Sequence, residues 1–145
     1  MALTTGHSYD TDIIAWSNEQ SALLRARRFS ELDIEHISDE VEDVGKSEQR
    51  ELAHRIALLL THLLKWKYQP ERRGASWDST IRTQRIAIES RLRKTPSLKA
   101  SIEDADWWTD PWADAVRAFF SETNLDMELP DVCPWSFESI MDESR

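Results

Sequence analysis

Apolar residues recur at intervals of three and four along almost the whole chain, the spacing of one face of an α-helix. The pattern predicts helices over residues 10–28, 30–44, 47–67, 76–94 and 110–124, with shorter helical segments over 97–102 and 133–138. Only 3 glycines and 5 prolines are present, which leaves little material for the turns of an all-β fold. We therefore expect an all-α fold, a helical bundle of six or seven helices.

The boundary near Gly45 rests on a change in the direction of the apolar face. Before it the stripe is Ile34, Ile37, Val41 and Val44, and after it the stripe from Leu52 onward is displaced by about 80° at ~100° per residue. Glycine commonly follows the end of a helix. Either the helix ends at Gly45 or it kinks there, and we favour a break. The helix before Gly45 is expected to be capped by Ser30, with its apolar stripe buried.

Length and composition indicate one domain over residues 1–145, with residues 1–8 as a flexible tail. The chain has no run of about 18 apolar residues and no signal-peptide pattern at its start, so we expect a cytoplasmic protein that does not enter membranes. Cys133 is the only cysteine, which excludes an internal disulfide.

The net charge of −9 is unevenly distributed. Residues 31–51 carry nine acids and two bases, residues 65–94 nine bases and three acids, and residues 103–143 twelve acids and one base. The simplest interpretation is that the acidic helix 30–44 lies against the basic helix 76–94, where Arg82 and Arg85 would meet its carboxylates.

One polar stripe is the strongest candidate for a site. Asp33, His36, Glu40 and Asp43 follow one another at helical spacing and share a face beside the apolar stripe. Asp33, His36 and Glu40 could hold a divalent metal, because a histidine and a carboxylate one turn apart can bind one cation. The alternative, which we favour, is a structural role in which the carboxylates complement the helix dipole and pair with arginines.

Arg85 falls on the apolar face of helix 76–94, where a charge requires a partner. Gln84 lies beside it and could extend a polar network toward Glu40 or Asp43. We thus expect one polar edge formed by Asp33, His36, Glu40, Asp43, Gln84 and Arg85.

Two further segments suggest partners. Trp107 and Trp108 are adjacent and point about 100° apart on a helix, so one of them is expected to mark a partner or self-association surface. Lys65, Lys67, Arg72 and Arg73 alternate with aromatic residues, as in nucleic-acid patches. The overall acidity opposes that role, because a phosphate backbone would be repelled.

Several motifs together resemble one bacterial family. The segments are 33–36, 39–48, 62–66, 76–77, 80–81, 84–85, 97–98 and 133–135, in this order, and they extend over Tyr9 to Asp142. They are similar to the family called domain of unknown function 29; residues 107–112 depart from its pattern. The resemblance implies an all-α fold and a bacterial protein, often from cyanobacteria or proteobacteria, and it implies no known activity.

Three classes of function follow. The favoured one is a binding or interaction bundle, with a homo-oligomer among the expected assemblies. The second is a metal-dependent hydrolase of a phosphate-containing small molecule, with Asp33, His36 and Glu40 as ligands and Arg85 on the anion. The third and least favoured is nucleic-acid binding through residues 65–94.

Overall fold

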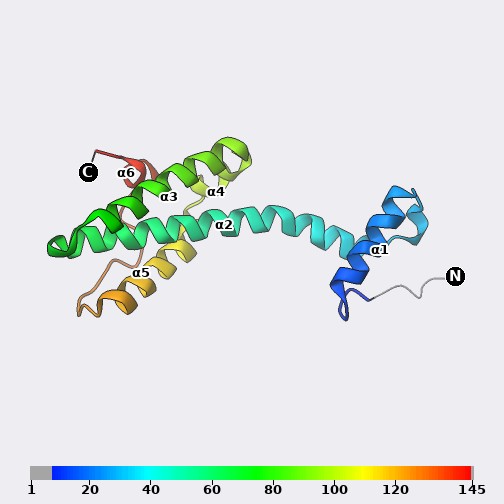
Figure 1. Ribbon diagram of the computed structural model, residues 1–145, viewed down its shortest axis with the longest axis horizontal. Coiled ribbons are helices and arrows are strands. Elements are labelled where there is room, and N and C mark those ends of the chain that lie inside the picture. Colours follow the sequence, from blue (N-terminus) through cyan, green and yellow to red (C-terminus); the bar gives the residue numbers. More distant parts are fainter. Residues whose placement is uncertain (1–7, 145) are drawn as a thin grey trace. The chain divides into compact units, whose positions relative to one another are not determined.

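The computed structural model describes residues 8–144, and these contain only helices, turns and irregular segments (Figure 1). The six α-helices of this part are α1 Ile13–Arg25, α2 Ile34–Tyr68, α3 Ala75–Lys94, α4 Lys99–Glu103, α5 Thr109–Thr123 and α6 Phe137–Met141. Short 3-10 turns lie at Phe29–Glu31, Pro70–Arg72, Pro96–Leu98 and Ala105–Trp108. The all-α prediction and its number of helices are confirmed. Of the predicted tail 1–8, only Ser8 lies within the described residues.

The predicted break at Gly45 is wrong. Helix α2 continues through it for 35 residues, about 50 Å at 1.5 Å per residue. Gly45 keeps helical backbone angles, and a β-carbon placed on it would meet nothing within 4 Å. Glycine in an exposed helix costs only about 1 kcal/mol relative to alanine, which a helix of this length tolerates. The two apolar stripes differ in direction because each serves a different part of the protein.

The described chain divides into two compact units between Ser47 and Glu48. We call residues 8–47 the N-terminal unit and residues 48–144 the C-terminal unit. The prediction of a single domain stays a prediction, because two units that share a helix can still fold together.

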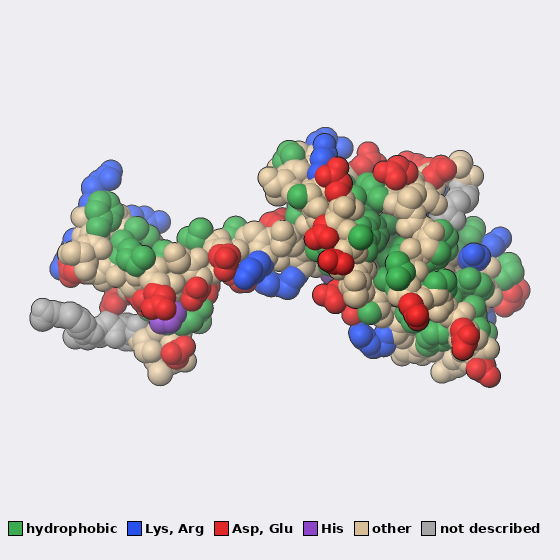
Figure 2. All heavy atoms as spheres, turned by 180° about the vertical axis from the view of Figure 1, so that it is seen from behind, with side chains coloured by type: hydrophobic (Ala, Val, Ile, Leu, Met, Phe, Trp, Pro, Cys, Tyr) green, Lys and Arg blue, Asp and Glu red, His purple; other side chains and the backbone are tan. Residues whose placement is uncertain are grey.

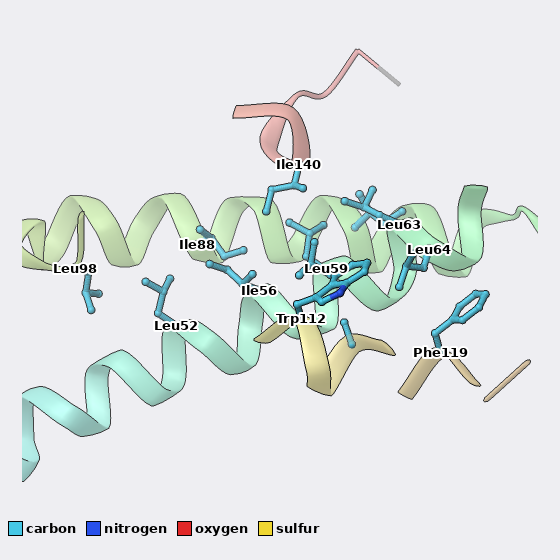
Figure 3. Close-up of a cluster of buried hydrophobic side chains, with 13 residues drawn as sticks. Leu52, Ile56, Leu59, Leu63, Leu64, Ile88, Leu98, Trp112, Phe119 and Ile140 are labelled. Atoms are coloured by element: carbon cyan, nitrogen blue, oxygen red, sulfur yellow. The ribbon is translucent and has the colours of Figure 1, made fainter. Parts of the chain in front are cut away.

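The C-terminal unit has a closed apolar core (Figure 3). The second half of α2 contributes its centre, and α3, α5 and α6 supply the side chains that cover it. Its fully buried large side chains are Leu52, Ile56, Leu59, Leu60, Leu64, Ile88, Pro111, Phe119 and Ile140. Trp135 and Phe137 pack against this core. The helical turn expected over residues 133–138 is instead α6, which starts at Phe137 because the Ser136 side chain caps it.

The N-terminal unit buries far less. Among its residues only Trp16 and Gln20 are buried, both on α1. Asp12 caps α1 by accepting a hydrogen bond from the Ala15 amide at 3.0 Å. The cap of α2 is Asp33, not Ser30, because Ser30 lies in a separate 3-10 turn. This unit therefore depends on polar contacts at the start of α2.

Candidate functional site

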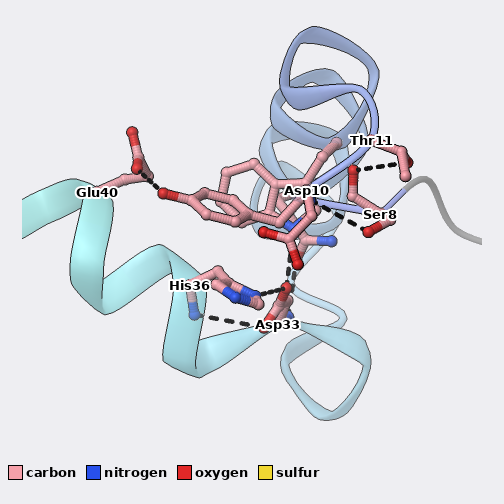
Figure 4. Close-up of polar contacts among 9 residues, drawn as sticks. Ser8, Asp10, Thr11, Asp33, His36 and Glu40 are labelled. Carbon is pink, nitrogen blue, oxygen red and sulfur yellow. Dashed lines mark hydrogen bonds and ion pairs between the residues drawn. The ribbon is translucent and has the colours of Figure 1, made fainter.

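Asp33 organises the N-terminal unit (Figure 4). Its Oδ1 accepts a hydrogen bond from the His36 amide at 3.4 Å, and its Oδ2 accepts one from Trp16 Nε1 at 2.9 Å. Its own amide donates to Gln20 Oε1 at 2.8 Å, which explains why Gln20 interrupts the apolar face of α1. One residue thus caps α2 and ties it to α1.

His36 and Tyr9 lie over this junction. The His36 ring lies 2.7 Å from Asp33 Oδ2 through Nδ1 and stacks on the Tyr9 ring, with centroids 4.1 Å apart. The Tyr9 hydroxyl donates to Glu40, and this hydrogen bond raises the pKa of Tyr9 to about 12. Trp16 meets Tyr9 edge to face at 4.9 Å.

The contact between Asp33 and His36 shifts both titrations. Partial burial pushes the pKa of the Asp33 carboxyl upward, but the hydrogen bonds from His36 and Trp16 outweigh it and hold that pKa below its ordinary value. The hydrogen bond to Asp33 raises the pKa of His36 against a smaller desolvation effect. The protonated imidazole and the ionised carboxylate therefore stabilise each other.

The residues predicted to form one polar edge have separate contacts. Asp33 and His36 bind each other, Glu40 accepts from Tyr9, and Asp43 lies exposed on α2. In the C-terminal unit, the Gln84 side chain accepts from Arg55 at 3.3 Å, and the buried Arg85 donates through Nε to the Ile140 carbonyl at 2.8 Å.

Arg82 pairs with Asp78, one turn earlier on α3. This ion pair lies within α3, and the expected pairing of Arg82 with the acids of residues 30–44 stays a prediction. Arg82 and Arg85 also line a cavity of about 190 Å³ together with Trp66 and Glu143. Their surroundings therefore belong to the C-terminal unit.

The divalent-metal hypothesis for Asp33, His36 and Glu40 stays a prediction. Within residues 8–144, no group of three or more histidine, cysteine, aspartate or glutamate side chains is arranged to hold a metal ion. Nδ1 of His36 is already directed at Asp33.

An open groove lies between α1 and the first part of α2 and was missed in the sequence. It measures about 420 Å³. Its lining residues are Trp16, Ser17, Gln20, Ser21, Leu24, Arg25, Ile37, Glu40, Val41 and Val44.

The expectation of a buried apolar stripe at the start of α2 is wrong, and Val41 and Val44 of this stripe line the groove. Ile34, Val41 and Val44 are 60%, 66% and 67% exposed. An apolar stripe at helical spacing predicts burial, but the same stripe stays exposed where no other element covers it. Figure 2 shows hydrophobic side chains at the surface of this unit among acidic ones.

The basic patch predicted around residues 65–73 is occupied by contacts within the protein. Lys65 is buried and bonds to Glu122, Lys67 lies over the rings of Tyr68 and Trp135, and Arg73 lies over Trp66 and donates to its carbonyl at 2.6 Å. These contacts give the interleaved aromatics a structural role.

Trp107 and Trp108, the predicted partner surface, are partly buried and pack against the core. Trp108 donates to the Ile102 carbonyl at 2.8 Å and meets Trp107 edge to face at 5.7 Å. Their role at a partner surface stays a prediction, while seven of the nine large exposed hydrophobic residues found in residues 8–144 lie in the N-terminal unit.

No helix among residues 8–144 combines the length and the apolar character that crossing a membrane requires. Comparison with curated proteins and with solved structures finds no match. The model of the family described as domain of unknown function DUF29 matches residues 8–145, which include both compact units. The motif at residues 33–36 lies at the Asp33 junction, and the motif at residues 133–135 lies just before α6. The family motifs therefore occur in both units. The chain belongs to the DUF29 family.

Proposed function

We propose that this protein is an interaction module that binds a protein partner in the groove between α1 and the first part of α2. The observation that carries the proposal is that the groove has an apolar wall open to solvent, formed by Val41 and Val44 of α2 together with Leu24 of α1. Contiguous exposed apolar surface on a small helical unit is typical of a binding site.

The Asp33 network supports a preformed groove. It fixes the start of α2 to Trp16 and Gln20 of α1, and both of these residues line the groove. A site whose walls are already held together loses little conformational entropy on binding. The polar stripe thus has a positioning role in this proposal, and the apolar stripe beside it makes the contacts.

The size of the unit also supports the proposal. About 40 residues bury too little surface to be strongly stable alone, and such units often gain stability from a partner. Burial of apolar surface contributes about 25 cal/mol per Å², so covering the exposed valines and Leu24 would stabilise both partners.

The proposal can be tested with a photo-crosslinking amino acid placed at Val41, and at Ile86 of α3 as the matched control. Ile86 is 64% exposed and lies outside the groove. We expect a reproducible protein adduct from position 41 in cells that express the protein, lost in the Val44→Gln background and absent from position 86. Equal adducts from both positions, or none from position 41, would contradict the proposal.

A second copy of this chain is the alternative occupant. Light scattering across a concentration series detects it as a dimer that dissociates on Val41→Gln substitution. A hetero-partner predicts a monomer whose mass does not change with concentration.

A further inference from the structure

We infer that the segment bound in this groove is a basic amphipathic helix of about three turns. The inference rests on the proposed function, since it specifies the chemistry of the partner at the same groove. It is carried by the charge around the groove and by the length of its walls.

The groove lies in a strongly acidic unit. Residues 8–47 contain ten acidic and four basic side chains, a formal charge of −6. Two of the bases are paired within the unit, Arg28 with Glu31 and Lys46 with Glu42, and a third, Arg25, lines the groove and donates to the Ser21 hydroxyl at 2.6 Å. The negative electrostatic potential of such a unit attracts a cationic segment and repels an anionic one.

The acids flank the apolar face of α2 on both sides. At about 100° per residue, Glu40 lies roughly 100° to one side of Val41, and Glu35 lies roughly 120° to the other side. Glu42 lies on the same side as Glu35, and its carboxylate is shared with Lys46. The hydrogen-bond partner of Glu40 is the Tyr9 hydroxyl, which brings no positive charge to it. The site is thus an apolar strip bordered by carboxylates.

This arrangement matches the two faces of a basic amphipathic helix. Its apolar residues at positions i, i+3 or i+4, and i+7 would fill the strip, and its lysines or arginines would reach the carboxylates at the border. The lining residues span about 14 Å of α1 and about 10 Å of α2 at 1.5 Å per residue. A contact of that length corresponds to two to three helical turns.

The same charges disfavour a second copy of this chain. Two copies of the groove would bring two units of formal charge −6 together. Like charges at an interface oppose association. A cationic hetero-partner has no such opposition.

The test uses three fluorescein-labelled 18-residue helical peptides that share the same leucine face. Their remaining positions are all lysine, all glutamine or all glutamate. Anisotropy with the full chain measures their affinities at low and at moderate salt. We expect the lysine peptide to bind about tenfold more tightly than the glutamine peptide, and the glutamate peptide to bind least. The difference should shrink as salt screens the charges.

Two pairs of variants separate apolar from electrostatic contributions. Val41→Gln with Val44→Gln should weaken all peptides about tenfold, while Ile86→Gln changes nothing. Glu35→Gln with Glu42→Gln should reduce only the preference for lysine. The matched control is Glu89→Gln with Glu103→Gln, which removes two exposed acids of the C-terminal unit. All four positions are exposed, so circular dichroism should show unchanged melting.

The outcomes distinguish the two proposals. Equal binding of the lysine and glutamine peptides, lost in the double valine variant, would overturn the charge inference and leave the proposed function intact. Failure of all three peptides to bind, or binding that the valine variant does not affect, would overturn both.

Discussion

The two units of this chain are stabilised in different ways. The C-terminal unit surrounds the second half of α2 with apolar side chains, so that Leu59, Phe119 and Ile140 are completely buried. The N-terminal unit keeps apolar side chains at its surface and is held together at one polar junction around Asp33. One helix can therefore bury its apolar face along one part and expose it along another, depending only on what covers it.

The largest expected effect lies in the apolar core. Phe119→Ala should lower the free energy of unfolding by about 3–5 kcal/mol, because it removes a fully buried ring and leaves a cavity. Urea denaturation followed by circular dichroism measures it. Ile86→Ala, at an exposed position of α3, should change it by less than about 0.5 kcal/mol. Similar losses from both variants would contradict the closed core.

A smaller and local effect is expected at the polar junction. Asp33→Ala removes the cap of α2 and the acceptor of Trp16 Nε1, and should destabilise the N-terminal unit by about 1–2 kcal/mol. Amide hydrogen exchange should accelerate over residues 34–44 and not over residues 56–64. Asp39→Ala, an exposed acid on the same helix, serves as the control. Acceleration across both stretches would show that the two units unfold together.

The same junction should make the N-terminal unit sensitive to pH. His36 has a raised pKa, so its stabilising charge is fully present below the ordinary value of about 6.5 and is lost as pH rises through the raised pKa. Asp33 has a lowered pKa, so its contribution is fully present above about 3.9 and is lost as pH falls through the lowered pKa. Protection of residues 34–44, corrected for intrinsic exchange, should peak between these values.

His36→Gln is the control for this pH dependence. It should remove the loss of protection on the neutral side of the peak and leave the acidic side in place, since Asp33 keeps its bond from Trp16. An unchanged neutral side in His36→Gln would assign the titration to another group.

The smallest expected effect is an increase in the stability of α2. Gly45→Ala should stabilise the first part of α2 by about 0.5–1 kcal/mol, because the position is helical and a β-carbon there meets no other atom. Slower exchange at residues 41–48 would report it. Destabilisation would mean that the backbone at Gly45 leaves the helical conformation in solution.

Periodicity predicted the helices well because most boundaries carry local signals. Thr95-Pro96 ends α3, and Asn124 ends α5 in the left-handed conformation with φ of 56°. Gly45 misled the prediction, because a glycine permits a helix end without requiring one. Ser30 misled it as well, because the better cap lies three residues later at Asp33.

The candidate site was only partly predictable. The close contact of Asp33 and His36 follows from their spacing of three residues on one helix. The contributions of Tyr9, Trp16 and Gln20 come from a separate helix and its preceding turn, and the sequence does not specify which faces meet. A polar residue on the apolar face of α1, Gln20, was the one available signal that this face meets a polar group.

The positions of the tryptophans give the two units separate optical signals. Six of the seven tryptophans, from Trp66 onward, belong to the C-terminal unit, and Trp16 is the single one before residue 48. The difference in emission between the natural chain and a Trp16→Phe variant therefore isolates one buried indole that donates its N–H to Asp33. Stopped-flow recording of that difference would measure the rate at which the junction opens, or the rate at which a partner binds, without any added label.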